Sequence, residues 1–481
     1  MSAQSAYLII DIGTGNVRVA VAEPNGRLLS IERENVRYER DEHYPESICF
    51  DPEQLWQQIS RLAQAALAAS GPVTIRALTA TSQREGIVTL GRRGESLLGM
   101  PNIDHRGREW EHCIADKSRV YELTGRYPTS LFSALKLVGL RERRGALWQK
   151  VTTFLSLSDW VQYRLSGVAR YEHSQASETL LYDVAGKQWS DELAGLFNLG
   201  IAPPPLQAAG TVLGPVRPEV AHDLGIAAEA IVVVGGSDTQ LAIRSMQPSV
   251  DDVVIVSGTT TPIIKIVDSY VTDEQQRTWT SRHIDENSFL LEANAGVTGL
   301  NYQRLKEIFY PAESYEVIEK EVAASEYSQC VAALGSLLAD EKSPLIRGGF
   351  IFNTPVSHQL MRGDFVFATL WDIACSIFEN YKSLCEVTTH RQDYIWACGG
   401  GVQSRMLRQY IANLTHKKVV IRDTYRQASV VGGVFVCNDA LGVSGAEPQT
   451  LEEVLPNNDA RFQGLYTDWK KARHVFKTVH G

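Results

Sequence analysis

The strongest constraint on the fold is a pattern of strand, small polar turn and strand that occurs twice in the chain. The first copy joins two apolar runs within residues 7–22 through the turn Ile12-Gly-Thr-Gly-Asn16. The second copy joins two apolar runs within residues 253–267 through the turn Gly258-Thr-Thr-Thr261. Both segments are typical of β-hairpins, so we expect two similar halves that meet near residue 248.

Strands and helices alternate over the rest of the chain. Short apolar runs predict strands, and residues 108–199 are expected to be mostly helical. Apolar residues recur at helical spacing in residues 52–69, 299–308, 370–387, 403–414 and 428–440. This alternation predicts an α/β protein.

Length and charge set further limits. The 481 residues exceed the ~250–300 at which one core stops growing, so we predict domains at residues 1–247 and 248–481. With 47 basic and 56 acidic residues, the net charge of −9 argues against binding to nucleic acid or to an anionic membrane surface. The N-terminus does not resemble a signal peptide, and no apolar run reaches the ~18 residues that span a bilayer. We therefore expect a cytoplasmic protein.

The first turn is a candidate phosphate and metal site. Asp11 ends a strand just before Gly13 and Thr14, and Arg18 follows Asn16 on the next strand. A carboxylate in this place can hold a hydrated magnesium ion, and the turn can present backbone N–H groups to phosphate. A plain hairpin turn explains the same residues equally well. The spacing fits neither a Walker loop nor a Rossmann fingerprint.

Three later segments also combine a strand with a turn of small residues. Gly235-Gly-Ser-Asp238 places a carboxylate at the carboxyl end of a strand, where it can accept a proton from a hydroxyl. An N-cap role for the next helix is the alternative. The turn at Gly258 is similar to the first turn, and Gly399-Gly-Gly401 lets a flat ring approach the backbone. Because such turns are common in α/β proteins, each motif alone is a weak signal.

The order of these motifs resembles the FGGY family of carbohydrate kinases, from about Tyr7 to Gly442. In motif detail the chain is most similar to autoinducer-2 kinase-like and glycerol kinase-like members. The resemblance implies two actin-like (ribonuclease-H-like) domains around a central cleft. Residues 1–247 would form the substrate and phosphate side, and residues 248–481 the nucleotide side. ATP and Mg²⁺ are the implied cofactors.

The resemblance also implies roles for single residues. Asp238 corresponds to the catalytic base, and Asp11 corresponds to the residue that holds magnesium, with Asp238 as a second metal ligand. The implied nucleotide-binding residues are Gly13, Thr14, Asn16, Arg18, Gly258, Thr259, Gly299, Gln303, Gly400, Gly401 and Ser404.

A further match implies the substrate-binding residues. Gln83-Arg84-Glu85 resembles a segment of glycerol kinases in which the arginine donates and the glutamate accepts hydrogen bonds at adjacent hydroxyls. Without the resemblance, a surface salt bridge between Arg84 and Glu85 is the simpler interpretation. Asp104, Thr239 and Asp238 complete the implied site, and the pattern around Asp104 and Thr239 is similar to the autoinducer-2 kinase branch. Leu131 replaces the tyrosine of the glycerol site.

These matches lead to one main hypothesis and three alternatives. We expect an ATP- and magnesium-dependent kinase that phosphorylates a small sugar-like molecule, with autoinducer-2 (dihydroxypentanedione) as the best guess. A ketose or polyol kinase of the xylulose, erythritol or glycerol type is the first alternative. The others are a non-catalytic actin-like nucleotide-binding sugar sensor or scaffold, and a glycoside hydrolase that uses Glu85 and Asp104. A homodimer is a further expectation.

Overall fold

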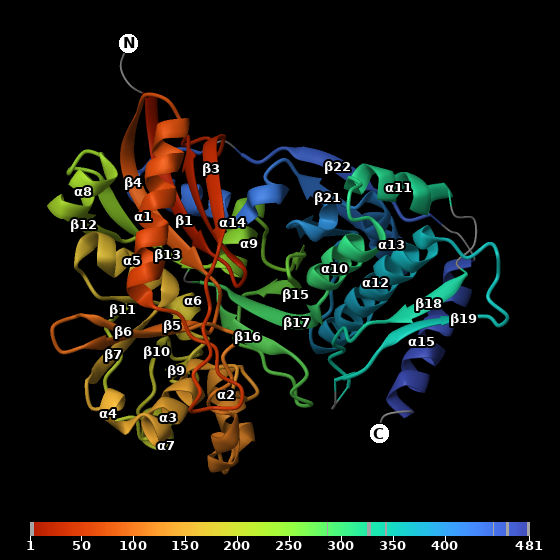
Figure 1. The fold of residues 1–481 in the computed structure, drawn as a ribbon, viewed down its shortest axis with the longest axis horizontal. Coiled ribbons are helices and arrows are strands. Elements are labelled where there is room, and N and C mark those ends of the chain that lie inside the picture. The colour runs from red at the N-terminus through yellow and green to blue at the C-terminus, as the bar shows by residue number, and fades with distance from the viewer. Residues whose placement is uncertain are drawn as a thin grey trace.

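The computed structural model describes residues 4–285, 287–324, 329–341, 344–445, 447–457 and 461–478. These residues form two large β-sheets that lie side by side, each flanked by helices (Figure 1). The first described strand belongs to the first sheet, and the last described helix lies beyond the second sheet. Across the described residues, every helix is too short or too polar to span a lipid bilayer.

The N-terminal sheet has the strand order β12-β13-β4-β1-β2-β3. In that order its strands are Val212–Pro215, Ile231–Ser237, Val73–Ser82, Gln4–Ile12, Asn16–Ala22 and Leu28–Asn35. β1 pairs antiparallel with β2 and parallel with β4. Residues 6–12 of β1 are buried on both faces, as is typical of a central strand that helices cover on both sides.

The C-terminal sheet has the strand order β16-β17-β15-β14-β20-β21-β22. In that order its strands are Trp279–Arg282, Phe289–Val297, Thr260–Val267, Val253–Val256, Tyr394–Cys398, Lys418–Arg422 and Thr450–Val454. The strands β3-β2-β1-β4-β13 and β17-β15-β14-β20-β21 match each other in order and direction. The expected repetition of two similar halves is therefore confirmed in the sheet topology.

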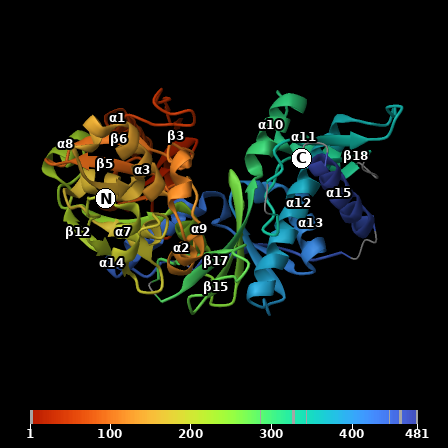
Figure 2. The same ribbon diagram turned by 90° about the horizontal axis from the view of Figure 1, so that it is seen from below.

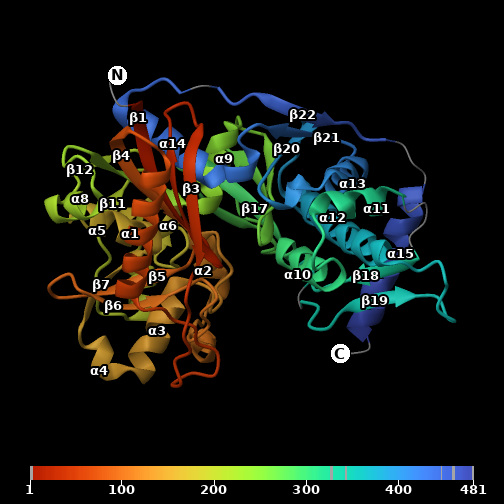
Figure 3. The same ribbon diagram turned by 45° about the horizontal axis from the view of Figure 1, so that its top comes forward.

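Two helices pack against each other where the sheets meet. α9 (Asp238–Met246) follows β13, and α14 (Ala428–Leu441) follows β21. α14 lies beside β1 and α9 (Figure 3), and the Tyr7 hydroxyl donates a hydrogen bond of 2.9 Å to Asn438 Oδ1 of α14. A Cβ atom on Gly432 would lie 1.9 Å from the Leu241 carbonyl oxygen, so glycine permits this close approach. The division of the chain after residue 247 stays a prediction.

The segment expected to be mostly helical contains more strand than predicted. α3 (Ser133–Arg143) and α5 (Leu157–Ser166) are present, but β7 (Val151–Ser156) pairs with β5 (Ile87–Gly91), which also pairs with β6 (Ser96–Met100). The prediction was wrong at β7, where a short run with β-branched and aromatic residues favours a strand. The helix predicted over residues 52–69 is confirmed as α1 (Pro52–Ala69).

The other elements complete the two halves. The remaining helices of the first half are α2 (Lys117–Thr124), α4 (Gly145–Trp148), α6 (His173–Ala176), α7 (Asp191–Phe197) and α8 (Pro218–Leu224). Its short strands are β8 (Tyr171–Glu172), β9 (Tyr182–Asp183), β10 (Gln188–Trp189) and β11 (Leu206–Gln207). The second half adds α10 (Gly299–Phe309), α11 (Tyr315–Ala324), α12 (Arg362–Val387), α13 (Arg405–Thr415), α15 (Arg461–Thr478), β18 (Cys330–Ala333) and β19 (Gly349–Phe352).

The edge of the C-terminal sheet is docked against the first half. Seen from below, β15 and β17 lie between the two parts of the molecule (Figure 2). The Tyr121 hydroxyl donates to the Thr278 carbonyl at 2.7 Å, and the Thr280 amide donates to the Gly125 carbonyl at 2.9 Å. The Trp279 and Phe132 rings meet edge to face. This docking fixes one wall of the site that lies between the sheets.

Candidate active site

A cleft of about 2510 Å³ opens between the two sheets and is lined by residues of both. It brings together residues that are far apart in the sequence. The predicted residues that line it are Gly13, Thr14, Asn16, Arg18, Gln83, Arg84, Glu85, Asp238, Thr239, Gly258, Thr259, Gly299, Gln303, Gly400, Gly401 and Ser404. Asp11 and Asp104 are fully buried and lie outside this lining.

The first turn lies at the carboxyl end of β1. Asp11 on β1 pairs in register with Arg18 on β2, so the two side chains lie next to each other. Arg18 Nη2 lies 2.5 Å from Asp11 Oδ2, which also accepts a hydrogen bond of 2.6 Å from the Ser429 hydroxyl. Arg18 Nη1 donates to Gln427 Oε1 at 3.0 Å. The start of α14 thus closes over the charged side chains of this turn.

Asp11 and Asp238 fit a magnesium site. Asp11 Oδ1 is buried and has no hydrogen-bond partner. The negative charge of Asp11 adds to burial in raising the pKa of Asp238, so the two carboxylates act on each other. Mg²⁺ in proteins is often held by one or two carboxylates, with phosphates and water as its other ligands. Within the described residues no group of three or more His, Cys, Asp or Glu is arranged to hold a metal.

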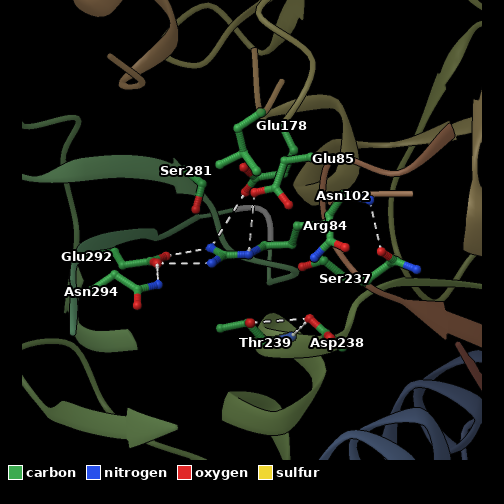
Figure 4. A network of polar contacts seen from close by, with 12 residues as sticks. Arg84, Glu85, Asn102, Glu178, Ser237, Asp238, Thr239, Ser281, Glu292 and Asn294 are labelled. Carbon is green, nitrogen blue, oxygen red and sulfur yellow. Dashed lines mark hydrogen bonds and ion pairs between the residues drawn. The ribbon is translucent and has the colours of Figure 1, made fainter. Parts of the chain in front are cut away.

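Asp238 is the first residue of α9, and it faces the cleft (Figure 4). Ser237 occupies the N-cap position without a side-chain capping hydrogen bond, so Asp238 is not the N-cap residue of α9. Asp238 Oδ1 accepts hydrogen bonds from the Thr239 amide at 2.7 Å and from the Thr239 hydroxyl at 3.2 Å. Burial and the Asp11 charge raise the pKa of Asp238 to about 6, and Arg84 opposes this shift. A carboxylate with this pKa is unprotonated at pH 7 and can accept a proton.

A buried hydrogen-bond chain supports Asp238 from behind. Glu172 Oε2 accepts from the Ser174 amide at 2.9 Å and from the Ser174 hydroxyl at 2.5 Å. The Ser174 hydroxyl in turn accepts from the Ser237 amide at 3.1 Å. Because Ser237 directly precedes Asp238, this chain fixes the start of α9. The sequence pattern gave no sign of it, because Ser174 and Ser237 are 63 residues apart and only the fold brings them together.

Arg84 lies in the cleft near Asp238, where the substrate was expected. It is 9% exposed, so it does not form the surface salt bridge that composition favours. Its two terminal nitrogens lie 2.5 Å and 3.0 Å from the two carboxylate oxygens of Glu292 on β17 (Figure 4). Glu178 and Glu85 also approach Arg84, at 3.9 Å and 4.0 Å. Burial raises the pKa of the Glu85 carboxyl, and the neighbouring Arg84 opposes this.

Gln83 and Asp104 were both expected to bind the substrate, but only Gln83 lines the cleft. Gln83 Oε1 accepts from the Asn102 amide at 3.0 Å, and Asn102 Nδ2 donates to the Thr14 hydroxyl at 2.9 Å. Gln83 therefore connects the substrate end of the cleft to the first turn. Asp104 Oδ2 accepts from Arg106 Nε at 2.8 Å inside the first half. The hydrolase alternative required Glu85 and Asp104 in one cleft, and the structure places only Glu85 there.

Three segments that contain glycine meet in the part of the cleft where the nucleotide was expected. The Gly258 amide donates to the Thr260 carbonyl, and the Gly401 amide donates to the Ser257 carbonyl, both at 2.9 Å. A Cβ atom on Gly299 would lie 2.1 Å from the Gly258 carbonyl oxygen, so glycine is required where these loops touch. Backbone atoms of these loops therefore come close together here, and the charged side chains of Arg405, Arg408 and Arg426 also line the cleft.

The residues that sequence reasoning missed are Glu292, Asn294, Glu178 and Arg126. Asn294 Nδ2 donates to Glu292 Oε1 at 3.0 Å, and Arg126 forms an ion pair with Glu178. Glu292 and Asn294 lie two residues apart in an otherwise apolar strand, so they share one face of β17. That alternation was a usable signal in the sequence. Glu178 and Arg126 stand in loops that carry no comparable pattern.

Comparison with known proteins identifies relatives along the whole chain. The N-terminal domain of the FGGY family of carbohydrate kinases matches residues 6–244, and the C-terminal domain of that family matches residues 322–441. The chain is 48% identical over 481 residues to the Bacillus subtilis (strain 168) protein named "Putative sugar kinase YoaC", covering 99% of this chain and 98% of that protein. It is 28% identical over 340 residues to autoinducer-2 kinase of Klebsiella pneumoniae subsp. pneumoniae, covering 67% of this chain and 62% of that protein.

Solved structures share the fold at lower sequence identity. A ligand-bound xylulose kinase from Lactobacillus acidophilus superposes with a TM-score of 0.85 at 18% identity, and the match covers 98% of each chain. Plasmodium falciparum glycerol kinase with ADP gives a TM-score of 0.84 at 17% identity, again over 98% of each chain. The expected α/β fold of two actin-like, ribonuclease-H-like domains is thus confirmed. This shared fold and the matches to both family domains show that the chain belongs to the FGGY family of carbohydrate kinases and is an ATP-using phosphotransferase.

Proposed function

We propose that this carbohydrate kinase transfers the γ-phosphoryl group of ATP to a hydroxyl of a small polyhydroxylated molecule, with Asp238 as the general base. The observation that carries the proposal is the position of Asp238. It faces the cleft between Arg84 at one end and the glycine-rich turns at the other, and its pKa is raised to about 6. A base must be unprotonated at working pH and within reach of the attacking hydroxyl.

In the proposed reaction the substrate hydroxyl oxygen attacks the γ-phosphorus, the bond to the bridging β,γ-oxygen breaks, and ADP leaves. The proton of the hydroxyl passes to Asp238 Oδ2, because Oδ1 already accepts two hydrogen bonds from Thr239. Arg18 and the backbone amides of the first turn would orient the transferred group. When bound by Asp11 and Asp238, magnesium supplies positive charge that offsets the charge of the phosphates.

Motion of the two halves would complete the site. We propose that residues 245–252, which join α9 to β14, act as a hinge on which the cleft closes. Closure would exclude water and so limit transfer of the phosphoryl group to water.

Two substrate classes remain in the proposal. The 28% identity to autoinducer-2 kinase and the motif at Asp104 and Thr239 support dihydroxypentanedione as the first choice. A ketose or polyol of the xylulose, erythritol or glycerol type is the alternative. Leu131, which lines the cleft, gives this end an apolar side chain next to the charged ones.

A coupled ADP-release assay with a substrate panel tests the proposal. The panel contains dihydroxypentanedione, xylulose, erythritol and glycerol, each with ATP and Mg²⁺. We expect one class to stimulate ADP release by at least tenfold over the rate with ATP alone. Mass spectrometry of the product should show one added phosphoryl group. If no member stimulates release while a control sugar kinase responds in the same assay, the proposed substrate class is wrong.

A further inference from the structure

Arg84, the arginine that was expected to hold the substrate, forms an ion pair with Glu292. Both side chains are buried, at 9% and 1% exposure, and both guanidinium nitrogens at the tip of Arg84 bind Glu292 oxygens (Figure 4). A planar guanidinium paired with a carboxylate through two hydrogen bonds is a strong and specific contact. The position at which a ligand carboxylate could bind both terminal nitrogens of Arg84 end-on is therefore already occupied by Glu292.

The fold holds this pair in place. Glu292 lies on β17, next to β16 in the sheet, and residues around β16 are tied to the first half through hydrogen bonds at Tyr121 and Gly125. Asn294 donates to Glu292 at 3.0 Å from the same face of the strand. The pair thus joins a loop after β4 to a strand 208 residues later, across an interface that is already packed.

The charges around the pair favour one kind of ligand. Glu292, Glu178 and Glu85 lie within 4.0 Å of Arg84, and Arg126 is paired with Glu178. Burial raises the pKa of Glu85 to about 8, so this group is mostly protonated at pH 7 and is not counted. The guanidinium groups of Arg84 and Arg126 then balance the carboxylates of Glu292 and Glu178, and the local sum is 2 − 2 = 0. Asp238 adds a further carboxylate at the adjacent wall. Carboxylates accept hydrogen bonds from hydroxyl groups, but they repel a ligand carboxylate at short range in a poorly solvated site.

We propose that Glu292 determines the specificity of this end of the cleft, selecting uncharged polyhydroxylated substrates and rejecting those that carry a carboxylate, such as aldonates. The inference rests on the proposed function and narrows its substrate class. An aldonate would have to displace Glu292 from Arg84 and leave a buried charge unpaired, which is costly. A polyol leaves the pair intact, and its hydroxyl groups donate hydrogen bonds to the free lone pairs of the Glu292 carboxylate.

The test compares matched pairs of ligands in which a terminal CH₂OH group is replaced by a carboxylate: glycerol with glycerate, erythritol with erythronate, and xylitol with xylonate. Binding is measured without ATP, by calorimetry. We expect the wild-type protein to bind at least one polyol at least tenfold more tightly than its aldonate. In Glu292→Gln, which keeps the size of the side chain, we expect aldonate affinity to rise at least tenfold.

Further variants separate this role from a structural one. Glu292→Asp keeps the charge and should keep the preference for the polyol. Arg84→Gln combined with Glu292→Gln should lose the gain in aldonate affinity, because the freed arginine is the group that binds it. Glu316→Gln removes a carboxylate from another element of the cleft, α11, and should leave the preference unchanged. Thermal unfolding checks that each variant is folded.

Two results would overturn the inference: wild-type protein that does not prefer any polyol to its aldonate, or a folded Glu292→Gln variant that binds no aldonate more tightly than the wild type. Failure of the proposed function gives a different result. In that case polyols bind with the expected preference, but no member of the substrate panel stimulates ADP release.

Discussion

The carboxyl edges of the two sheets carry similar turns but different side chains. In the N-terminal sheet the sequence Asp11-Ile-Gly-Thr14 leads into a turn whose charged residues meet Ser429 of α14. In the C-terminal sheet the equivalent sequence is Val256-Ser-Gly-Thr259, with no charged residue. Each turn has a glycine amide that donates at 2.9 Å to a carbonyl farther along the turn. The two turns therefore share a backbone hydrogen bond but differ in the charged side chains around them.

The same contrast appears where each sheet's last parallel strand passes into a helix. Asp238 begins α9 after β13, whereas Ala428 begins α14 after β21 and its short connecting turn. In the proposed mechanism, the charges that act on the phosphoryl group and the proton lie on the first edge. The turns of the second edge bring backbone and glycines close together, where the nucleotide is expected. The comparison shows that equivalent places of a repeated fold can carry different side chains, and we propose that this difference divides the work of the reaction.

The largest expected effect comes from making the first turn resemble the second. Asp11→Asn removes the charge but keeps the size, and we expect turnover to fall by about 10²-fold, since such groups contribute that much to charge stabilisation. The Mg²⁺ concentration for half-maximal rate should rise. Steady-state rates over a Mg²⁺ titration measure both effects. Unchanged turnover and Mg²⁺ dependence would show that the two edges do not differ in this way.

A methyl group on the neutral edge should affect nucleotide binding instead. In Gly299→Ala the added Cβ would meet the Gly258 carbonyl oxygen at 2.1 Å, so the two loops must separate. Overpacking of this kind costs about 1–3 kcal/mol, so we expect ADP affinity to fall by about tenfold. Calorimetric titration with ADP measures this. A loss of turnover at saturating ATP with normal ADP affinity would contradict the assignment of this edge.

A smaller effect is expected from the contact that joins the edges. Ser429→Ala removes the 2.6 Å hydrogen bond to Asp11 but leaves the Arg18 ion pair. A single hydrogen bond contributes about 0.5–1.5 kcal/mol, so we expect turnover to fall by about threefold. Initial rates at saturating substrates test this. An effect as large as that of Asp11→Asn would mean that α14, not the first turn, controls the charge there.

The smallest effect concerns the buried acids behind the charged edge. Burial raises the pKa of Asp159 to about 8 and that of Glu172 to about 7, so the folded protein binds their protons more tightly than the unfolded chain does. Stability should therefore fall as pH rises from about 4 to about 8. Between pH 5.5 and 8.5 the unfolding temperature of the wild type should therefore fall by a few degrees more than that of Asp159→Asn. The exposed Asp223→Asn is the control and should keep the wild-type slope.

The sequence predicted the elements better than it predicted the contacts between them. The bounds of α1, the two hairpins and the glycine turns follow from local periodicity and turn chemistry, which a short window contains. The pairing of Arg84 with Glu292 could not be predicted, because the order of β17 in the second sheet brings them together. The burial of Asp104 beside Arg106 has the same cause: a motif gives residue types, and packing decides which of them face the cleft.

The most direct test of the account is single-turnover phosphoryl transfer by Asp238→Asn, with the substrate found in the panel and radiolabelled ATP. The variant keeps the size of the side chain but cannot accept the proton. We predict a rate at least about 10² times lower than that of the wild type, with ADP affinity within twofold of it. Transfer at a near-normal rate would contradict the account, because some other group would then be the base.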